Sequence, residues 1–258
     1  MPCGGVNHKI SHEIIISLLV EGVPLIMNLC RLCRKKRELR DSHIIPEFCY
    51  KPLYDPKHRM AKLNIESRNK KLLQKGIREK LLCADCEQHL NKEYETPFCN
   101  FWFKKSTLPK KLPYEPFIIS GIDHQKFKLF HLSLLFRAGV STLKEFEEVS
   151  LGPHEEKLRL MLLSNQLETS SFYNIGAVHI GNNDKNKNHL MIISPCKTRF
   201  FEYTSYMFTF GGCAWNYILS SHSQERTLDI MLNKDGTLPL ISIDWRIIVN
   251  HSKACDRS

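Results

Sequence analysis

Four of the ten cysteines form two Cys-x-x-Cys pairs, Cys30 with Cys33 and Cys83 with Cys86. Each pair presents two sulfurs across a tight turn, and two pairs supply the four soft ligands that a tetrahedral zinc ion prefers. We identify no signal-peptide pattern, so this spacing favours a metal site over disulfides. A redox dithiol is the alternative, but no thioredoxin-like βαβ pattern surrounds either pair. We therefore predict one structural Zn2+ held by these four cysteines.

The 49 residues between the two pairs contain the sequence SHIIP, in which His43 follows Cys33 by ten positions and Pro46 ends the run. This order of a Cys-x-x-Cys pair, His-x-x-Pro and a second pair that opens a helix resembles the HNH endonucleases. The stretch LRDSHIIPEF at 39–48 is similar to a bacterial HNH-like group, as are SLLFRA at 133–138 and LGPHEEKLR at 151–159. The resemblance covers most of residues 27–258.

The resemblance implies a ββα-metal motif with a structural zinc and a site that hydrolyses phosphodiester bonds. It makes His43 the general base, a task suited to a side chain that titrates near neutral pH. It also implies one catalytic divalent ion, Mg2+ or Mn2+, acting as a Lewis acid. The alternative is that His43 simply bonds a backbone carbonyl inside the motif.

The expected ligands of the catalytic ion depart from the family pattern. Ser42 stands where many members carry Asp or His, and Asp41 would face the other way on a strand. Glu87 follows the second pair where many members carry His or Asn, so we assign Glu87 as the ligand and Asn91 as a catalytic helper. The family's middle asparagine corresponds to Asn64 or Asn69. Alternatively, Glu87 is an acid favoured by the helix dipole.

Helical spacing supports this choice of ligand over His89. Residues four apart share a helix face, which groups Glu87, Asn91 and Glu95 with Tyr94 and places His89 on the opposite side.

The positive charge is concentrated around the cysteine pairs. Residues 27–113 hold 21 Lys and Arg against 10 Asp and Glu, whereas the remainder holds 16 against 17. Such a basic region on a neutral body indicates a partner with negative charge, here nucleic acid, although a solvated basic surface is the alternative. Lys35, Lys36 and Arg37 are the expected phosphate contacts. The aromatic run 101–103 either stacks on bases or packs against the body.

The pattern of the chain predicts an α+β fold in four parts. Residues 1–26 are an N-terminal extension, with Met27 as the suspected natural start or, alternatively, a short helix packed on the body. Residues 27–113 form the zinc module, 114–168 a helical segment and 169–258 an antiparallel β-rich part. Pro97 is expected to start a second short helix after the one opened by the second cysteine pair.

The helical and β-rich parts carry more specific expectations. A buried helix over 127–137 should end at Gly139, Thr142 and Glu145 have capping-box spacing, and a further helix should run from Gly152-Pro153 to about Leu163. Strands are expected over 175–180, 190–194, 206–210 and 238–243, and residues 215–220 form a helix or a strand.

The leading functional hypothesis is a metal-dependent endonuclease acting on DNA, with a role in defence against foreign DNA. The alternatives are a non-catalytic, zinc-stabilised nucleic-acid-binding module and an RNA-directed nuclease or toxin. The β-rich region is the expected site of any protein partner. No apolar run reaches the roughly 20 residues that span a bilayer, so we expect no membrane association and a cytoplasmic location.

Overall fold

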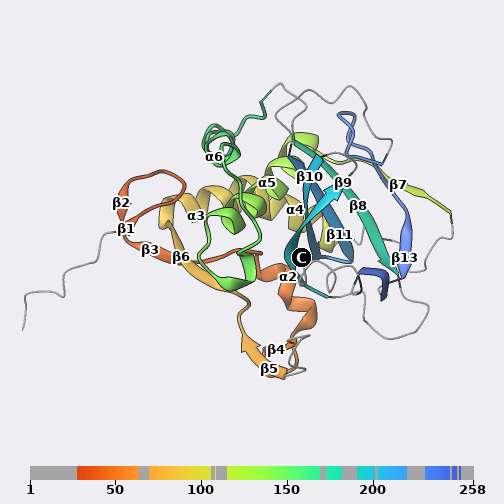
Figure 1. Cartoon of the computed structure of the whole chain (residues 1–258), viewed down its shortest axis with the longest axis horizontal. Helices are drawn as coiled ribbons and strands as arrows, with labels where there is room; N and C mark the ends of the chain where they lie inside the picture. Colours follow the sequence, from red (N-terminus) through yellow and green to blue (C-terminus); the bar gives the residue numbers. More distant parts are fainter. Residues whose placement is uncertain are drawn as a thin grey trace, which may run out of the picture.

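The computed structural model describes residues 28–63, 70–105, 108, 115–168, 173–181, 191–200, 203–219, 230–244, 246–248 and 250. The expectations for residues 1–26, Met27, Asn64 and Asn69 lie outside these ranges. Within them the chain mixes helices with mainly antiparallel sheets, as the α+β prediction requires (Figure 1).

The cysteine-rich region begins with a short ribbon and continues as a hairpin and a helix. The ribbon pairs β1 (Asn28–Leu29) with β2 (Lys36–Arg37), and the hairpin pairs β3 (Leu39–His43) with β6 (Arg78–Cys83). Helix α3 (Ala84–Leu90) follows β6 directly. A long insertion separates β3 from β6 and contains α2 (Glu47–Tyr50), the 3-10 turn η1 (Lys51–Leu53) and a second hairpin of β4 (Arg59–Leu63) with β5 (Lys70–Gln74).

Helix α3 continues without a break to residue 104. Two wide π turns, η2 (Asn91–Glu95) and η3 (Asn100–Lys104), alternate with α3 and α4 (Thr96–Cys99). Pro97 lies at the second position of α4, so a second short helix does begin there, but the chain is already helical at Glu95 and Thr96 does not cap it. A proline removes one backbone donor and crowds the preceding turn, and a π turn next to it accommodates both effects.

The helical segment contains α5 (His124–Val140), the 3-10 turn η4 (Lys144–Phe146) and α6 (His154–Ser164). Helix α5 is buried along most of its length, as predicted. It extends one residue past Gly139. A Cβ at this position would clash with the Leu151 side chain, which explains why the helix carries glycine there. Thr142 does not cap η4, since its amide and hydroxyl both donate to Glu79.

The C-terminal region forms a five-stranded sheet in the order β13-β8-β11-β10-β9. Its strands are β8 (Tyr173–Gly181), β9 (Ile193–Phe200), β10 (Tyr203–Phe210), β11 (Cys213–Leu219) and β13 (Ser242–Asp244). Residues 215–219 are therefore a strand. All neighbours run antiparallel except β13, which pairs with β8 in parallel. A separate pair joins β7 (Phe117–Ile119) to β12 (Leu238–Leu240).

The predicted parts share one hydrophobic core. Helix α5 lies beside the sheet (Figure 1), and the ring of its His131 lies 4.3 Å from the ring of Trp215 on β11. Phe98, from α4, stacks at 3.8 Å on Phe130. The buried cluster runs from Cys30 to Leu240, so the cysteine-rich region and the sheet are packed on the same helices.

Candidate functional site

The four cysteines of the two pairs come together, as predicted. Their sulfur atoms all lie within 4.8 Å of one another, and the Sγ atoms of Cys33 and Cys83 are 3.8 Å apart. Four sulfurs bound at about 2.3 Å to one tetrahedral ion would lie about 3.8 Å apart. A disulfide needs a sulfur separation of about 2.05 Å, so this is a thiol cluster.

Local backbone geometry produces this cluster. The first pair sits in a tight turn in which the Arg34 amide donates to the Cys30 carbonyl at 2.9 Å, and Arg34 takes a left-handed φ of 57°. The second pair spans the end of β6 and the first turn of α3. A bond of 3.0 Å from the Arg31 amide to the Leu81 carbonyl joins the turn to β6.

The electrostatics of the cluster suit a thiolate-binding cation. A hydrogen bond from the Cys86 thiol lowers the pKa of Cys30 to about 4, with further help from backbone amides, among them those of Cys33 and Cys83. The same bond raises the pKa of the Cys86 thiol. The Cys30 sulfur is therefore ready as an anion, while Cys86 keeps a proton that a bound cation would displace. The donor set and its spacing fit a tetrahedral Zn2+ ion.

His43 lies at the end of β3, half-buried, at the mouth of the long insertion. Its Nε2 lies 2.8 Å from the Lys75 carbonyl. A carbonyl only accepts, so Nε2 carries the hydrogen and Nδ1 keeps its lone pair. Burial lowers the pKa of His43, which keeps the ring neutral. The backbone bond considered as the alternative role is thus present, and it also leaves one nitrogen able to take a proton.

The strand pattern of β3 decides which side chains accompany His43. A bulge between Arg40 and Asp41 shifts the register against β6. Ser42 is fully buried and its Oγ accepts from the Leu82 amide at 3.1 Å, so it faces the core. Asp41 faces the other way, as predicted, and therefore lies on the same side of the strand as His43. Its exposed carboxylate lies 3.8 Å from Arg78.

Tyr94 does not share the expected common face with Glu87, Asn91 and Glu95. Asn91 is exposed, and its Oδ1 accepts from the Thr96 hydroxyl at 3.1 Å. Tyr94 instead lies with His89, because the π turn η2 brings residues five apart into line. Both side chains bond the Leu162 carbonyl at 2.8 Å, which occupies His89 structurally.

Glu87 is half-buried on α3. Its Oε1 is enclosed and has no hydrogen-bond partner among the described residues. The carboxylate is also close enough to Glu95 to raise the pKa of that buried acid, an effect secondary to burial. An enclosed carboxylate oxygen without a donor is costly unless it gains a partner such as a bound cation.

Sequence reasoning missed a buried ion pair behind His43. Arg137, 1% exposed on α5, contacts the Glu95 carboxylate at 2.8 Å and donates at 2.7 Å to the His43 carbonyl. It also bonds Ser133 one turn earlier. The available signal was a single arginine in an otherwise apolar helix, since a buried charge needs a specific partner.

A second arginine, Arg159 on α6, plays the same part for the first cysteine pair. It donates at 2.9 Å to the Leu32 carbonyl and is held by Glu156 at 2.7 Å. Glu156 also accepts from Arg34 in the turn. The helical segment thus holds both the cysteine turn and the His43 strand through their backbone carbonyls.

The predicted phosphate contacts differ from one another. Lys35 and Lys36 are exposed and have no acidic partner among the described residues. Arg37 is half-buried and paired with Asp85, which competes with any phosphate. The aromatic run packs against the body: Trp102 is 3% exposed and its indole donates at 2.9 Å to the Gly211 carbonyl.

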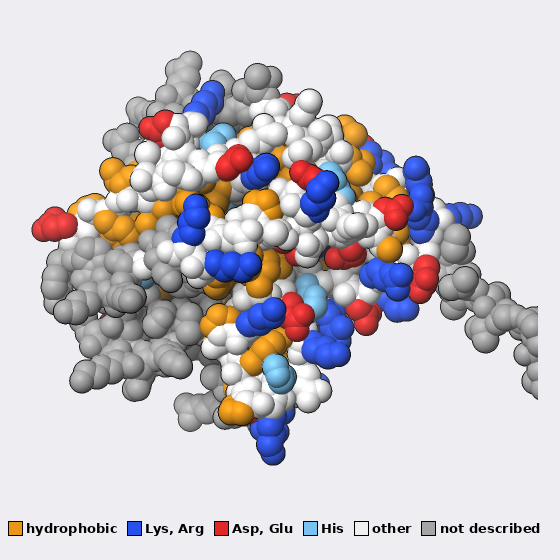
Figure 2. All heavy atoms as spheres, turned by 180° about the vertical axis from the view of Figure 1, so that it is seen from behind, with side chains coloured by type: hydrophobic (Ala, Val, Ile, Leu, Met, Phe, Trp, Pro, Cys, Tyr) orange, Lys and Arg blue, Asp and Glu red, His pale blue; other side chains and the backbone are white. Residues whose placement is uncertain are grey.

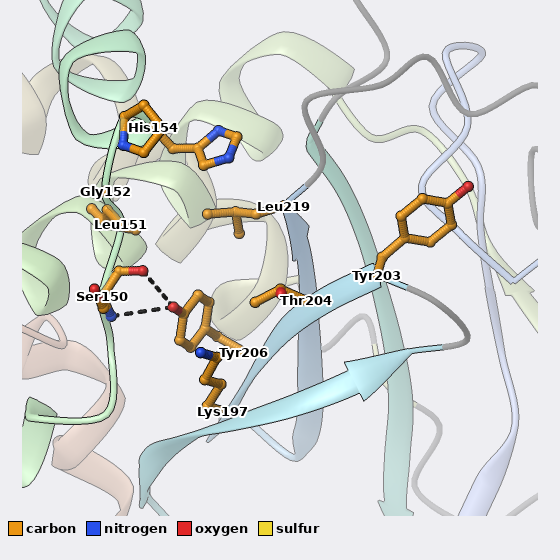
Figure 3. A pocket seen from close by; sticks show the side chains of 10 residues that line it. Ser150, Leu151, Gly152, His154, Lys197, Tyr203, Thr204, Tyr206 and Leu219 are labelled. Atoms are coloured by element: carbon orange, nitrogen blue, oxygen red, sulfur yellow. Dashed lines mark hydrogen bonds between the residues drawn. The ribbon is translucent and has the colours of Figure 1, made fainter.

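A polar cavity of about 390 Å³ lies apart from these residues, between the loop before α6 and strands β9 to β11 (Figure 3). Its lining includes His154, Lys197 and Tyr206, and the Tyr206 hydroxyl bonds both backbone atoms of Ser150. None of the predicted site residues lines it.

Comparison of the chain with known protein families, curated proteins and solved structures finds no match. None of the described helices combines the length and apolar content needed to span a bilayer.

Proposed function

We propose that this protein is a metal-dependent endonuclease that hydrolyses phosphodiester bonds in DNA, built on a zinc-held module of the HNH type. The observation that carries the proposal is His43. It stands at the end of a strand whose hairpin partner leads into the cysteine-bearing helix, with Nε2 held by a carbonyl and Nδ1 left as a proton acceptor.

In this proposal His43 takes a proton from the attacking water. The bond to Lys75 fixes the ring's tautomer and orientation, and the low pKa caused by burial keeps the base unprotonated at neutral pH. Arg137 holds the backbone of the same residue from behind. Hydrogen bonds therefore fix both the side chain and the main chain of the proposed base, and a general base needs such fixed positioning.

Glu87 is the residue that would hold the catalytic divalent ion, Mg2+ or Mn2+. Its enclosed, unpartnered oxygen supports this role. When bound, such an ion supplies a Lewis acid for the phosphate and its leaving oxygen. Asn91 is exposed and engaged with Thr96, so we propose no part for it in the chemistry.

A second candidate function is a zinc-stabilised binding module without catalysis. The specific observation in its favour is Ser42, which stands in the family's acidic position and faces the core instead of the histidine. Asp41 is the carboxylate on the same side of β3 as His43. A catalytic module would use Asp41 to compensate for the missing acid at position 42.

The test is cleavage of plasmid DNA by the full chain with Mg2+ or Mn2+, comparing the parent with His43→Ala and a control, His124→Ala. His124 is also a half-buried histidine and lies at the start of α5. We expect metal-dependent cutting by the parent and the control and a loss of at least about 100-fold for His43→Ala, with zinc content unchanged.

Undiminished cutting by His43→Ala would overturn the assignment of the base. A folded, zinc-loaded parent that binds DNA but cuts neither DNA nor RNA with either metal would favour the binding module.

A further inference from the structure

The insertion between β3 and β6 begins and ends beside the proposed catalytic histidine. His43, the last residue of β3, and Arg78, the first residue of β6, are register partners across the hairpin. We call residues 51–78 the basic arm; the structure describes 51–63 and 70–78 of it. Any partner held along the base of this arm lies beside His43.

Most of the net positive charge of the cysteine-rich region belongs to this arm. Residues 51–78 carry nine Lys and Arg against two Asp and Glu, a net of +7 of the +11 found over residues 27–113. Figure 2 shows Lys and Arg side chains at the tip of the lower projection of the molecule and where it joins the body, in the part that holds the β4–β5 hairpin in Figure 1.

Four of the described cations are not neutralised by the fold. Arg59 pairs with Asp55, Lys62 with Glu145 and Arg78 with Asp41. Lys51, Lys57, Lys71 and Lys75 are exposed and have no acidic partner among the described residues, and the last three lie on or beside the β4–β5 hairpin.

Lys71 also stands directly opposite Lys62 in the register. Lys62 is already paired with Glu145, so Lys71 is the cation of this facing pair that is left for an external anion.

The shape of the arm suits a duplex. It is a two-stranded ribbon that pairs with no other strand among the described residues. One face rests on the body through Met60 and Leu73, while Ala61, Leu72 and Gln74 face solvent, with Leu72 51% exposed. A two-stranded ribbon of this kind fits the major groove of B-DNA, which is about 12 Å wide.

The base of the arm is tied to the site itself. The Lys75 carbonyl accepts from His43, and Lys75 and Gly76 both take left-handed φ angles, 61° and 66°. Gly76 is packed against Tyr50, with the position of a Cβ only 2.7 Å from that ring. The turn that carries the Lys75 ammonium is thus held firmly against the proposed base.

We propose that the basic arm binds the phosphate backbone of duplex DNA through Lys57, Lys71 and Lys75 and so delivers a phosphodiester to His43. This inference rests on the proposed function for the identity of the substrate. The contacts are to phosphate, so binding by the arm is independent of base sequence.

The test measures the salt dependence of binding to a fluorescent duplex by anisotropy, with the full chain in the His43→Ala background. The arm variant combines Lys57→Gln, Lys71→Gln and Lys75→Gln. The control combines Lys126→Gln, Lys197→Gln and Lys234→Gln, which remove the same charge from three exposed lysines outside the arm. Each phosphate contact contributes about 0.9 to the slope of log K against log salt.

We expect the slope to fall by about 2.7 in the arm variant, with the control unchanged from the parent. Equal slopes for the arm variant and the control would overturn the arm's role, whether or not the parent with His43 cuts DNA. Conversely, a parent that binds DNA with the arm-dependent slope but never cuts would leave the arm supported and the nuclease refuted. Binding to single-stranded RNA with no binding to the duplex would overturn both.

Discussion

Replacing Arg137 by methionine should destabilise the protein strongly, because Arg137 is the buried partner of a buried acid. Arg137 is 1% exposed and Glu95 8% exposed, and their charged atoms are 2.8 Å apart. The substitution leaves the Glu95 carboxylate without its cation and the His43 carbonyl without its donor. Methionine keeps a similar length and leaves little space unfilled.

Removal of one partner from a buried pair costs roughly 3–5 kcal/mol. For a chain of this size, each kcal/mol corresponds to about 2–4 °C in the melting temperature, so we expect a fall of about 10 °C. Burial already raises the pKa of Glu95. Without Arg137, Glu95 must bind a proton on folding, although it is ionised in the unfolded chain at neutral pH. That requirement weakens as the pH falls, so the loss of stability relative to the parent should shrink towards pH 5.

The assay is urea unfolding followed by the fluorescence of the buried Trp102 and Trp215. The control is Arg246→Met, because Arg246 forms an exposed pair with Asp244 that should contribute about 1 kcal/mol or less.

Adding Glu95→Leu to Arg137→Met removes both charges and should recover part of the loss. A loss for Arg137→Met no larger than that of the control would refute the reasoning. So would a double variant that is no more stable than Arg137→Met alone.

Three further predictions concern the site. Cys83→Ser should lose most bound zinc and unfold at lower temperature, since zinc binding is coupled to folding; stoichiometric zinc by metal analysis would contradict this. Burial lowers the pKa of His43, so the cleavage rate should hold steady from pH 8 downward and fall only below the ordinary histidine value of about 6.5; a decline that begins above pH 7 would argue against His43 as the base. Gly76→Ala should cost roughly 1–3 kcal/mol, because alanine disfavours a φ of 66° and its Cβ would meet the Tyr50 ring; an unchanged melting temperature would disagree with that contact.

Patterns that are local in the sequence predicted the structure well. The two Cys-x-x-Cys pairs converge because each pair is one turn and the β3–β6 hairpin brings the two turns together. The buried helix α5, helix α6 and strands β8 and β10 follow from apolar periodicity and turn residues. These features depend on neighbours within a few positions along the chain, which a sequence displays directly.

Helix geometry that departs from the regular α turn could not be predicted from the sequence. The π turn η2 brings His89 and Tyr94 to the same carbonyl, although the four-residue spacing used for prediction placed them on opposite sides of the helix. Pro97 indicated a helix start, and α4 does begin at Thr96, but α4 continues directly from the π turn η2 instead of following an N-cap. The error over Tyr94 comes from assuming 3.6 residues per turn where packing selects a wider one.

The sequence was enough to locate the four thiols, the basic region and His43, because residue type and short spacing specify each of them. Tertiary packing alone determined what surrounds them. It brought the Arg137 guanidinium into hydrogen-bond contact with the carbonyl of His43, which lies 94 positions away in the chain. It also made Arg78, at the far end of the insertion, the register partner of His43. Such contacts join residues far apart in the chain, and their partners are set by how helices and strands fill one shared core rather than by any local pattern.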